Sequence, residues 1–258
     1  METERLLLAS TNDRKLMPRV LEFSGLTQAQ LTLGNGGSYG AAVFASRTEV
    51  LSVRRPLGRG ESMFGQLDEQ LRMSRMLAVA DGSPERPFAP HRLMPYRYKG
   101  WVFAFVGDRP SAEQPDGSER EVAFVNQNGG NDSPSHRLMA RVMYRVQRAT
   151  HGATDPDAAA LRAAILDATA NVAGFERYAI ALTTEQSGVV VSQGMDMFHR
   201  FVTVKHQNPF SRDEELLSLA HLKGSVIVVG AAPDGRDWKR LDEGKSVSLA
   251  EVGPPKVF

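Results

Sequence analysis

The order of the apolar segments along the chain is the feature that most limits its fold. Short apolar runs with the length of strands come first, two longer segments with helical periodicity follow near the middle, and short apolar runs return in the last third. A succession of strands, paired helices and strands is typical of an α+β layered domain. The sequence shows no internal repeat and no linker, so we expect residues 1–258 to form a single domain.

The first half of the sequence predicts mostly strands, joined by turns and two short helices. Strands are expected over 5–10, 41–46, 49–54, 76–80 and 101–106. Helices are expected to end near Phe23, with Pro18 in the first turn, and to span 62–75. The glycine-rich segment 33–40 is predicted to be a turn, and the polar segment 109–131 a long irregular excursion.

Two helices are predicted next, and each begins with a cap residue followed by a proline. The first begins after Asp132-Ser133 at Pro134, and its apolar face includes Leu138 and Val142. The second begins at Thr154-Asp155-Pro156 and continues past Val172 to Gly174. Five strands complete the prediction, over 177–184, 188–192, 198–204, 225–230 and 247–252.

Composition excludes several classes of protein. The chain has no cysteine, which excludes disulfides, thiolate nucleophiles, Cys-ligated zinc and iron–sulfur clusters. Lys and Arg number 31 against 30 Asp and Glu, a net charge of +1, whereas nucleic-acid and membrane-surface proteins usually carry a clear basic excess. No apolar run approaches the ~18–20 residues of a membrane helix. We therefore expect a cytoplasmic protein that binds neither nucleic acid nor a membrane. The histidine spacing gives no positive signal for a metal site, and no cofactor is expected.

Seven segments, none of them specific alone, share their order and spacing with one protein family. They lie at 4–9, 37–40, 76–83, 94–96, 101–107, 131–133 and 228–233. Gly37-Ser38-Tyr39-Gly40 stands where the family has Asp-Gly-Trp-Gly, and 101–107 where it has Trp-x-Phe-Ala-His-Asn-Gly. On these segments the chain resembles the class II glutamine amidotransferases, and most closely their stand-alone bacterial type. The resemblance implies the N-terminal nucleophile hydrolase fold, a four-layer αββα sandwich of two facing sheets with helices outside.

The positions that carry the chemistry in that family hold unsuitable residues here. Glutamine hydrolysis in the family uses an N-terminal Cys, an Asn–Gly pair for the oxyanion, an Arg for the substrate carboxylate and an Asp for its ammonium group. The nucleophile position falls on Glu4, the Arg position on Ala80, and the Asn–Gly pair on Val106 and Gly107. Asp132 keeps the family residue. The resemblance therefore implies no catalytic residue, and leaves Asp132 as the remnant of a ligand site.

We interpret the chain as a pseudoenzyme that acts as a binding, regulatory or structural subunit, sensing an amino acid or holding a partner protein or a second copy. Two remnants have plainer explanations. Asp132 can simply cap a helix, which is worth ~1 kcal/mol, and Gly107 can serve the backbone angles of a strand end.

The alternative interpretation is an active hydrolase or amidotransferase with non-cysteine chemistry in the same cleft, using Ser38, Asp132 or Glu4. Gly36 to Gly40 match the nucleophile-elbow string Gly-x-Ser-x-Gly. That motif requires a strand before the serine and a helix after it. Since a strand is predicted after Gly40, a glycine-rich turn is the favoured interpretation.

Four arginines recur on one face of the helix that follows Asp132. They are Arg137, Arg141, Arg145 and Arg148, and no acidic residue of the same helix interrupts them. Two interpretations stay open at this point. The face is either a solvated basic surface or a docking surface for an acidic partner, for which arginine is the favoured residue.

Overall fold

The computed structural model describes residues 4–12, 17–24, 26, 37–45, 49–58, 73–81, 93–111, 117–129, 133–151, 153, 156–170, 172–206, 220–230, 233, 237–242, 244–249 and 254–257. The elements in chain order are β1 (Glu4–Thr11), α1 (Met17–Phe23), β2 (Gly37–Phe44), β3 (Val50–Leu57), β4 (Arg75–Asp81), β5 (Tyr96–Tyr98), β6 (Trp101–Gly107), α2 (Glu119–Asn128), α3 (Pro134–Thr150), α4 (Ala158–Thr169), β7 (Tyr178–Thr183), β8 (Gly188–Gln193), β9 (Met197–His206), β10 (Ala220–Val229), β11 (Lys239–Arg240), β12 (Ser246–Leu249) and β13 (Lys256–Val257). No helix among these residues is long and apolar enough to cross a membrane.

The strands of the described residues form two antiparallel sheets. One has seven strands in the order β11-β9-β10-β1-β4-β2-β3, and the other has six in the order β13-β12-β8-β7-β6-β5. β1 lies inside the first sheet, where Leu7 is opposite Val228 of β10 on one side and Ala78 of β4 on the other. The first sheet therefore joins segments from near both ends of the chain.

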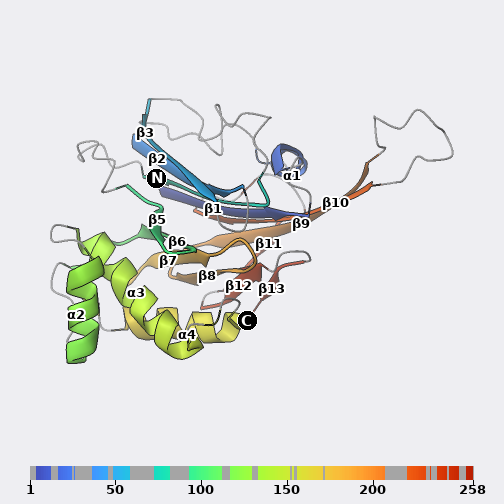
Figure 1. The fold of residues 1–258 in the computed structure, drawn as a ribbon. Helices are drawn as coiled ribbons and strands as arrows, with labels where there is room; N and C mark the ends of the chain where they lie inside the picture. The colour runs from blue at the N-terminus through green and yellow to red at the C-terminus, as the bar shows by residue number, and fades with distance from the viewer. Residues whose placement is uncertain are drawn as a thin grey trace.

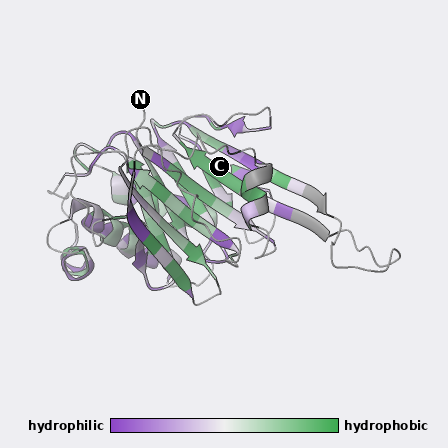
Figure 2. Ribbon diagram, turned by 90° about the horizontal axis from the view of Figure 1, so that it is seen from above, coloured by the Kyte–Doolittle hydropathy of each residue, from purple (hydrophilic) through white to green (hydrophobic). Residues whose placement is uncertain are grey.

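The two sheets share an apolar core. Leu6 and Leu8 of β1 belong to the same buried cluster as Phe105 of β6, whereas Leu7 packs on the opposite face with Val20 of α1. β1 is thus buried on both faces, which explains its uninterrupted apolar run. Figure 1 shows α1 on the outer side of the first sheet, and α3 and α4 on the outer side of the second. The strands at the centre carry the hydrophobic segments (Figure 2).

Most of the predicted elements are confirmed. The strands predicted over 5–10, 49–54, 76–80 and 101–106 are β1, β3, β4 and β6, and those of the last third are β7, β8, β9, β10 and β12. Pro18 lies in the first turn of α1, and α3 begins at Pro134. The predicted helix over 62–75 lies outside the described residues up to 72, and Arg75 already belongs to β4.

The prediction of an irregular excursion over 109–131 is wrong, because this segment contains helix α2. The helix begins after Ser118, whose hydroxyl accepts a hydrogen bond from the backbone N–H of Glu121 at 3.3 Å. The buried side chains of α2 are Glu121 and Val125. A helix that buries a carboxylate has no wide apolar stripe, so hydrophobic periodicity could not reveal it.

Two boundaries also differ from the prediction. α4 begins at Ala158 rather than at Pro156, because its first helical hydrogen bond runs from the Leu161 N–H to the Asp157 carbonyl at 3.0 Å. It ends at Thr169, before Val172. The predicted turn at 37–40 belongs instead to β2.

Gly40 explains why glycine is needed inside β2. A Cβ atom at this position would lie 1.8 Å from the carbonyl oxygen of Met94. The backbone of the Met94–Pro95 segment therefore crosses the strand at a distance that only glycine permits. This approach places against β2 the first two residues of Met94-Pro95-Tyr96, the segment that stands where the family has His-Pro-Phe.

Candidate functional site

The candidate site lies where three strands of the first sheet end in one row. Glu4 of β1 is opposite Asp81 of β4, and Asp81 is in turn opposite Ser38 of β2. The register therefore brings two of the residues predicted for catalysis, Glu4 and Ser38, to one end of the sheet. Asp132, the third, lies outside the described residues.

Ala80 occupies the position of the substrate-binding arginine and serves the core. It is wholly buried and belongs to the apolar cluster on the α1 side of the first sheet, together with Tyr39. Side chains alternate along a strand, so the face of β4 toward the second sheet carries Val79 and Asp81 instead. The polar group at this end of β4 is consequently Asp81, which the sequence comparison did not single out.

Asp81 forms an ion pair that bridges the two sheets. Its carboxylate accepts a hydrogen bond from the guanidinium group of Arg109 at 2.5 Å, and Arg109 follows β6 of the second sheet. The guanidinium also lies over the ring of Phe105, 5.6 Å from its centroid. A charged contact therefore spans the edge of the space between the sheets, beside the row of Glu4, Asp81 and Ser38.

The residues at the two oxyanion positions, Val106 and Gly107, contribute to core packing and to the backbone conformation. Val106 is 1% exposed and packs in the core between the sheets. Gly107 has a φ of 110°, and a Cβ atom there would lie 2.2 Å from the carbonyl oxygen of Arg177. The next backbone N–H, of Asp108, donates to that same carbonyl at 2.7 Å. Gly107 is thus required by the backbone, as the plainer interpretation expects.

A polar cluster surrounds Tyr96 at the start of α3. Burial raises the pKa of Tyr96, and hydrogen bonds to Ser133 and Ser135 partly offset that rise. The ring of His136 stacks on Tyr96 with centroids 3.7 Å apart. Arg54 of β3 donates to the carbonyl oxygen of Pro95 at 2.6 Å. Sequence reasoning did not bring these groups together, because they converge from β3, β5 and α3 only in the folded chain.

Ser133 caps α3, since its hydroxyl accepts a hydrogen bond from the His136 N–H at 3.4 Å. A capping residue was expected at this point of the sequence, and Ser133 is the one that provides it. The remnant ligand role assigned to Asp132 remains a prediction.

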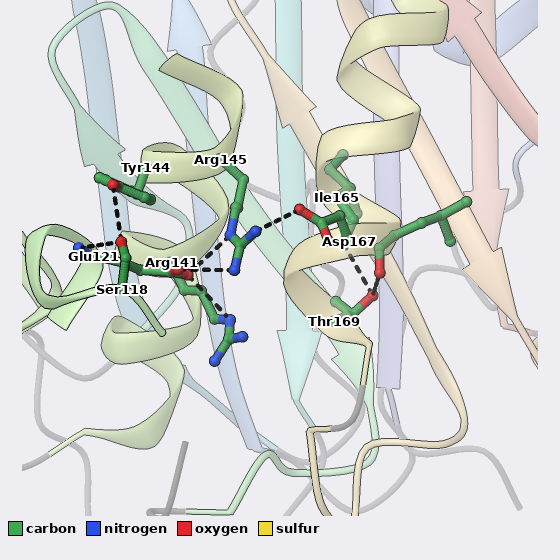
Figure 3. A network of polar contacts seen from close by, with 9 residues as sticks. Ser118, Glu121, Arg141, Tyr144, Arg145, Ile165, Asp167 and Thr169 are labelled. Carbon is green, nitrogen blue, oxygen red and sulfur yellow. Dashed lines mark hydrogen bonds and ion pairs between the residues drawn. The ribbon is translucent and has the colours of Figure 1, made fainter. Parts of the chain in front are cut away.

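The arginines of α3 do not form one free face, and this corrects the expected basic surface. The side chain of Arg141 is only 6% exposed and lies 3.5 Å from the carboxylate of Glu121 on α2. Arg145 pairs with Glu121 at 2.8 Å and with Asp167 of α4 at 2.8 Å. The acidic partners come from neighbouring helices, as Figure 3 shows, so the sequence of α3 alone gave no sign of them.

Burial and charge act differently on the two central arginines. Burial lowers the pKa of Arg141, against the opposing effect of the Glu121 charge. Burial also acts to lower the pKa of Arg145, but its hydrogen bond and ion pair with Glu121 outweigh burial and the pKa is raised. Arginine is not deprotonated in proteins, so the network joining α2, α3 and α4 is ionic.

The two outer arginines differ from this pair. Arg148 is exposed and lies over the ring of Tyr144, 6.0 Å from its centroid. Arg137 is half-buried and lies beside Gly129 at the end of α2. A Cβ atom added to Gly129 would lie 3.0 Å from the Cα atom of Arg137. The four arginines therefore do not share one exposed surface, and Arg148 is the exposed one among them, so their role in binding a partner remains a prediction.

The serine of the Gly-x-Ser-x-Gly string does not sit in a nucleophile elbow. Ser38 lies within β2, opposite Asp81 and Pro56, and not at a strand-to-helix turn. None of the hydrogen bonds among the described residues joins its hydroxyl to a carboxylate or an imidazole. The same part of the chain contains no group of three or more His, Asp or Glu side chains placed to hold a metal ion.

Comparison with known proteins finds solved structures with a similar fold. No family model matches the sequence, and no curated protein matches it. Among solved structures, a glutamine aminotransferase class-II domain protein from Silicibacter pomeroyi is 13% identical, covers 98% of both chains and has a TM-score of 0.54. A predicted glutamine amidotransferase from Pseudomonas aeruginosa is 15% identical over 96% of this chain and 93% of that chain, with a TM-score of 0.48.

A larger enzyme shares the fold. The glutamine phosphoribosylpyrophosphate amidotransferase of B. subtilis is 10% identical, with a TM-score of 0.54 over 98% of this chain and 48% of that one. The chain thus spans about half the length of that enzyme. The fold is that of the class II glutamine amidotransferases, the N-terminal nucleophile hydrolase fold, as the sequence resemblance predicted. At these identities the likeness shows the fold alone.

Proposed function

We propose that the protein is a class II glutamine amidotransferase-like pseudoenzyme, a single domain over residues 1–258 with the four-layer αββα sandwich, which acts as a binding, regulatory or structural subunit. One observation supports the proposed loss of catalysis. The positions of the substrate-binding arginine and the oxyanion asparagine hold Ala80 and Val106, and both side chains are buried in apolar clusters. These positions contribute to the core and present no polar group to a ligand.

The polar groups at this end of the first sheet, Ser38 and Asp81, support the same proposal. A nucleophile needs a base within hydrogen-bond reach. Among the residues that the structure describes, Ser38 makes no such contact, and the Asp81 carboxylate is paired with Arg109. Loss of one oxyanion donor alone slows comparable reactions ~10²–10³-fold. An active hydrolase that uses Ser38 is therefore the less favoured function.

We also propose a cytoplasmic location and a protein partner or a second copy of the chain as the binding target. A net charge of +1 supports a target other than nucleic acid. Arg141 and Arg145 of α3 are paired with Glu121, and Arg145 also with Asp167, which leaves these two arginines less available to a polyanion.

Glutamine is expected to leave the melting temperature of the protein unchanged at millimolar concentration. A ligand at about 100 times its Kd stabilises a protein by ~2.7 kcal/mol, which moves the melting temperature by several degrees. Differential scanning calorimetry with and without glutamine measures this directly. A clear upward shift that disappears in Asp132→Ala would show that the pocket still binds glutamine.

Asp157→Ala is the matched control for that experiment. Asp157 also precedes a helix, but its side chain makes no capping hydrogen bond. A glutamine-dependent shift lost in both variants would point to a general effect on stability, whereas loss in Asp132→Ala alone would assign the site and contradict the proposal.

A further inference from the structure

The edge strand β3 has an unusual exposed surface. It ends the seven-stranded sheet, and among the described strands it pairs only with β2. Leu51 is 41% exposed and Val53 is 53% exposed. In the part of the chain that the structure describes, the other exposed large apolar residues, Val122 and Val257, lie on separate elements. Edge strands are usually protected by charge, proline or a bulge. β3 carries Arg54, Arg55 and Pro56 in its second half, whereas residues 50–53 contain neither a charge nor a proline.

We propose that β3 pairs antiparallel with β3 of a second copy, so that two sheets continue across a two-fold axis. This interface rests on the edge geometry and is independent of the catalytic status of the cleft. An isologous contact requires a strand whose sequence complements itself. Unpaired backbone groups along an edge supply hydrogen bonds in such strand addition, and side chains select the register.

The sequence of β3 fits one register. With Ser52 opposite the partner's Ser52, Leu51 faces the partner's Val53, and Glu49 faces the partner's Arg55. The exposed apolar pair is then covered by its own copy, and opposite charges meet at both ends. These odd-numbered residues all point to the same side of the sheet, so the residues that this register sets opposite each other can make contact.

The neighbouring registers fit less well. A shift of two residues in one direction sets Leu51 against the partner's Arg55, and a shift in the other sets Glu49 against the partner's Val53. Both lose the Glu49–Arg55 charge pairs and set one of these charges against an apolar side chain on the exposed face, whereas the favoured register sets a charge against an apolar side chain only on the opposite face, Arg54 against Val50. Pro56, which has no N–H to donate, lies beyond the paired segment in the favoured register and costs no hydrogen bond there.

A single cysteine tests the register, because the natural chain contains none. In Ser52→Cys, two thiols meet at the two-fold axis, at the separation of directly opposite residues, and mild oxidation should link the copies. Val122→Cys, equally exposed on α2, measures collisional linking. We expect Ser52→Cys to give linked dimer at least tenfold faster at low micromolar concentration. Equal rates for the two variants would overturn the proposal.

Charge exchange tests the same register without a covalent link. Glu49→Arg and Arg55→Glu should each weaken the dimer at least tenfold in sedimentation equilibrium, and the double variant should restore it to within about threefold, as complementary pairs require. Arg55 also lies over the ring of Tyr39, so the melting temperature of each variant is measured alongside. A double variant as weak as the singles would refute the register.

The paired variant Leu51→Lys with Val53→Lys completes the test. It should be a folded monomer, whereas Val122→Lys should still dimerise, because edge lysines block strand pairing. A natural chain that sediments at its single-chain mass of 28.3 kDa at tens of micromolar would overturn the interface altogether.

Discussion

Replacing Arg75 by methionine is expected to lower the free energy of unfolding by about 3–5 kcal/mol. Arg75 is wholly buried at the start of β4. Its guanidinium donates to the hydroxyl of Thr183 and to the carbonyl oxygens of Thr184, Gln186 and Leu249, all between 3.2 and 3.3 Å. Methionine fills much of the volume but donates nothing, so these four oxygens lose the guanidinium as a donor, and the Thr184 carbonyl oxygen keeps a second donor, the Thr183 hydroxyl.

Urea denaturation measures the effect of Arg75→Met, with an unchanged m-value as the sign that only stability changed. Arg240→Met is the matched control. The Arg240 side chain is 68% exposed, so its loss should change stability by no more than ~0.5 kcal/mol. If both variants unfold at the same urea concentration as the natural protein, the hydrogen bonds from Arg75 of β4 to Thr183 of β7 and Leu249 of β12 do not stabilise the fold.

The second large effect is expected at Glu121. Glu121→Ala should cost about 3–5 kcal/mol, because it removes the buried carboxylate shared by two arginines of α3, and the buried Arg141 loses that ion pair. Glu119→Ala, on the exposed face of the same helix, provides the control and should cost little. Chemical denaturation of the two variants is the measurement.

A double-mutant cycle separates the ion pair from packing. Removing Glu121 in an Arg141→Met background should cost markedly less than in the natural chain, since the uncompensated charge is then absent. Equal costs in the two backgrounds would show that α2 is held by contacts other than this ion pair.

The elements that sequence reasoning predicted correctly are those whose apolar pattern is local. The run Leu6–Ala9 indicates a strand buried on both faces, and β1 is one. The Ser133-Pro134 pair indicates a helix start, and α3 begins there. The short strands β5, β11 and β13 were not predicted, because two or three residues carry no periodicity.

Features that depend on contacts between distant segments could not be predicted. α2 is stabilised by Glu121 against α3, so a polar sequence folds as a helix. The arginines of α3 seemed to share one free face, because the acids that pair with Arg145 lie on two other helices. A position-by-position comparison named Ala80, but the alternation of side chains along β4 turns Asp81 toward the second sheet.

The most direct test of the central claim is the release of glutamate and ammonia from glutamine by the purified full-length protein. We expect no release above the rate in buffer, because Val106 and Ala80 fill the positions of the oxyanion asparagine and the carboxylate-binding arginine. Release above that rate, lost in Ser38→Ala or Asp132→Ala and kept in Asp157→Ala, would contradict the account and show a working active site in the cleft.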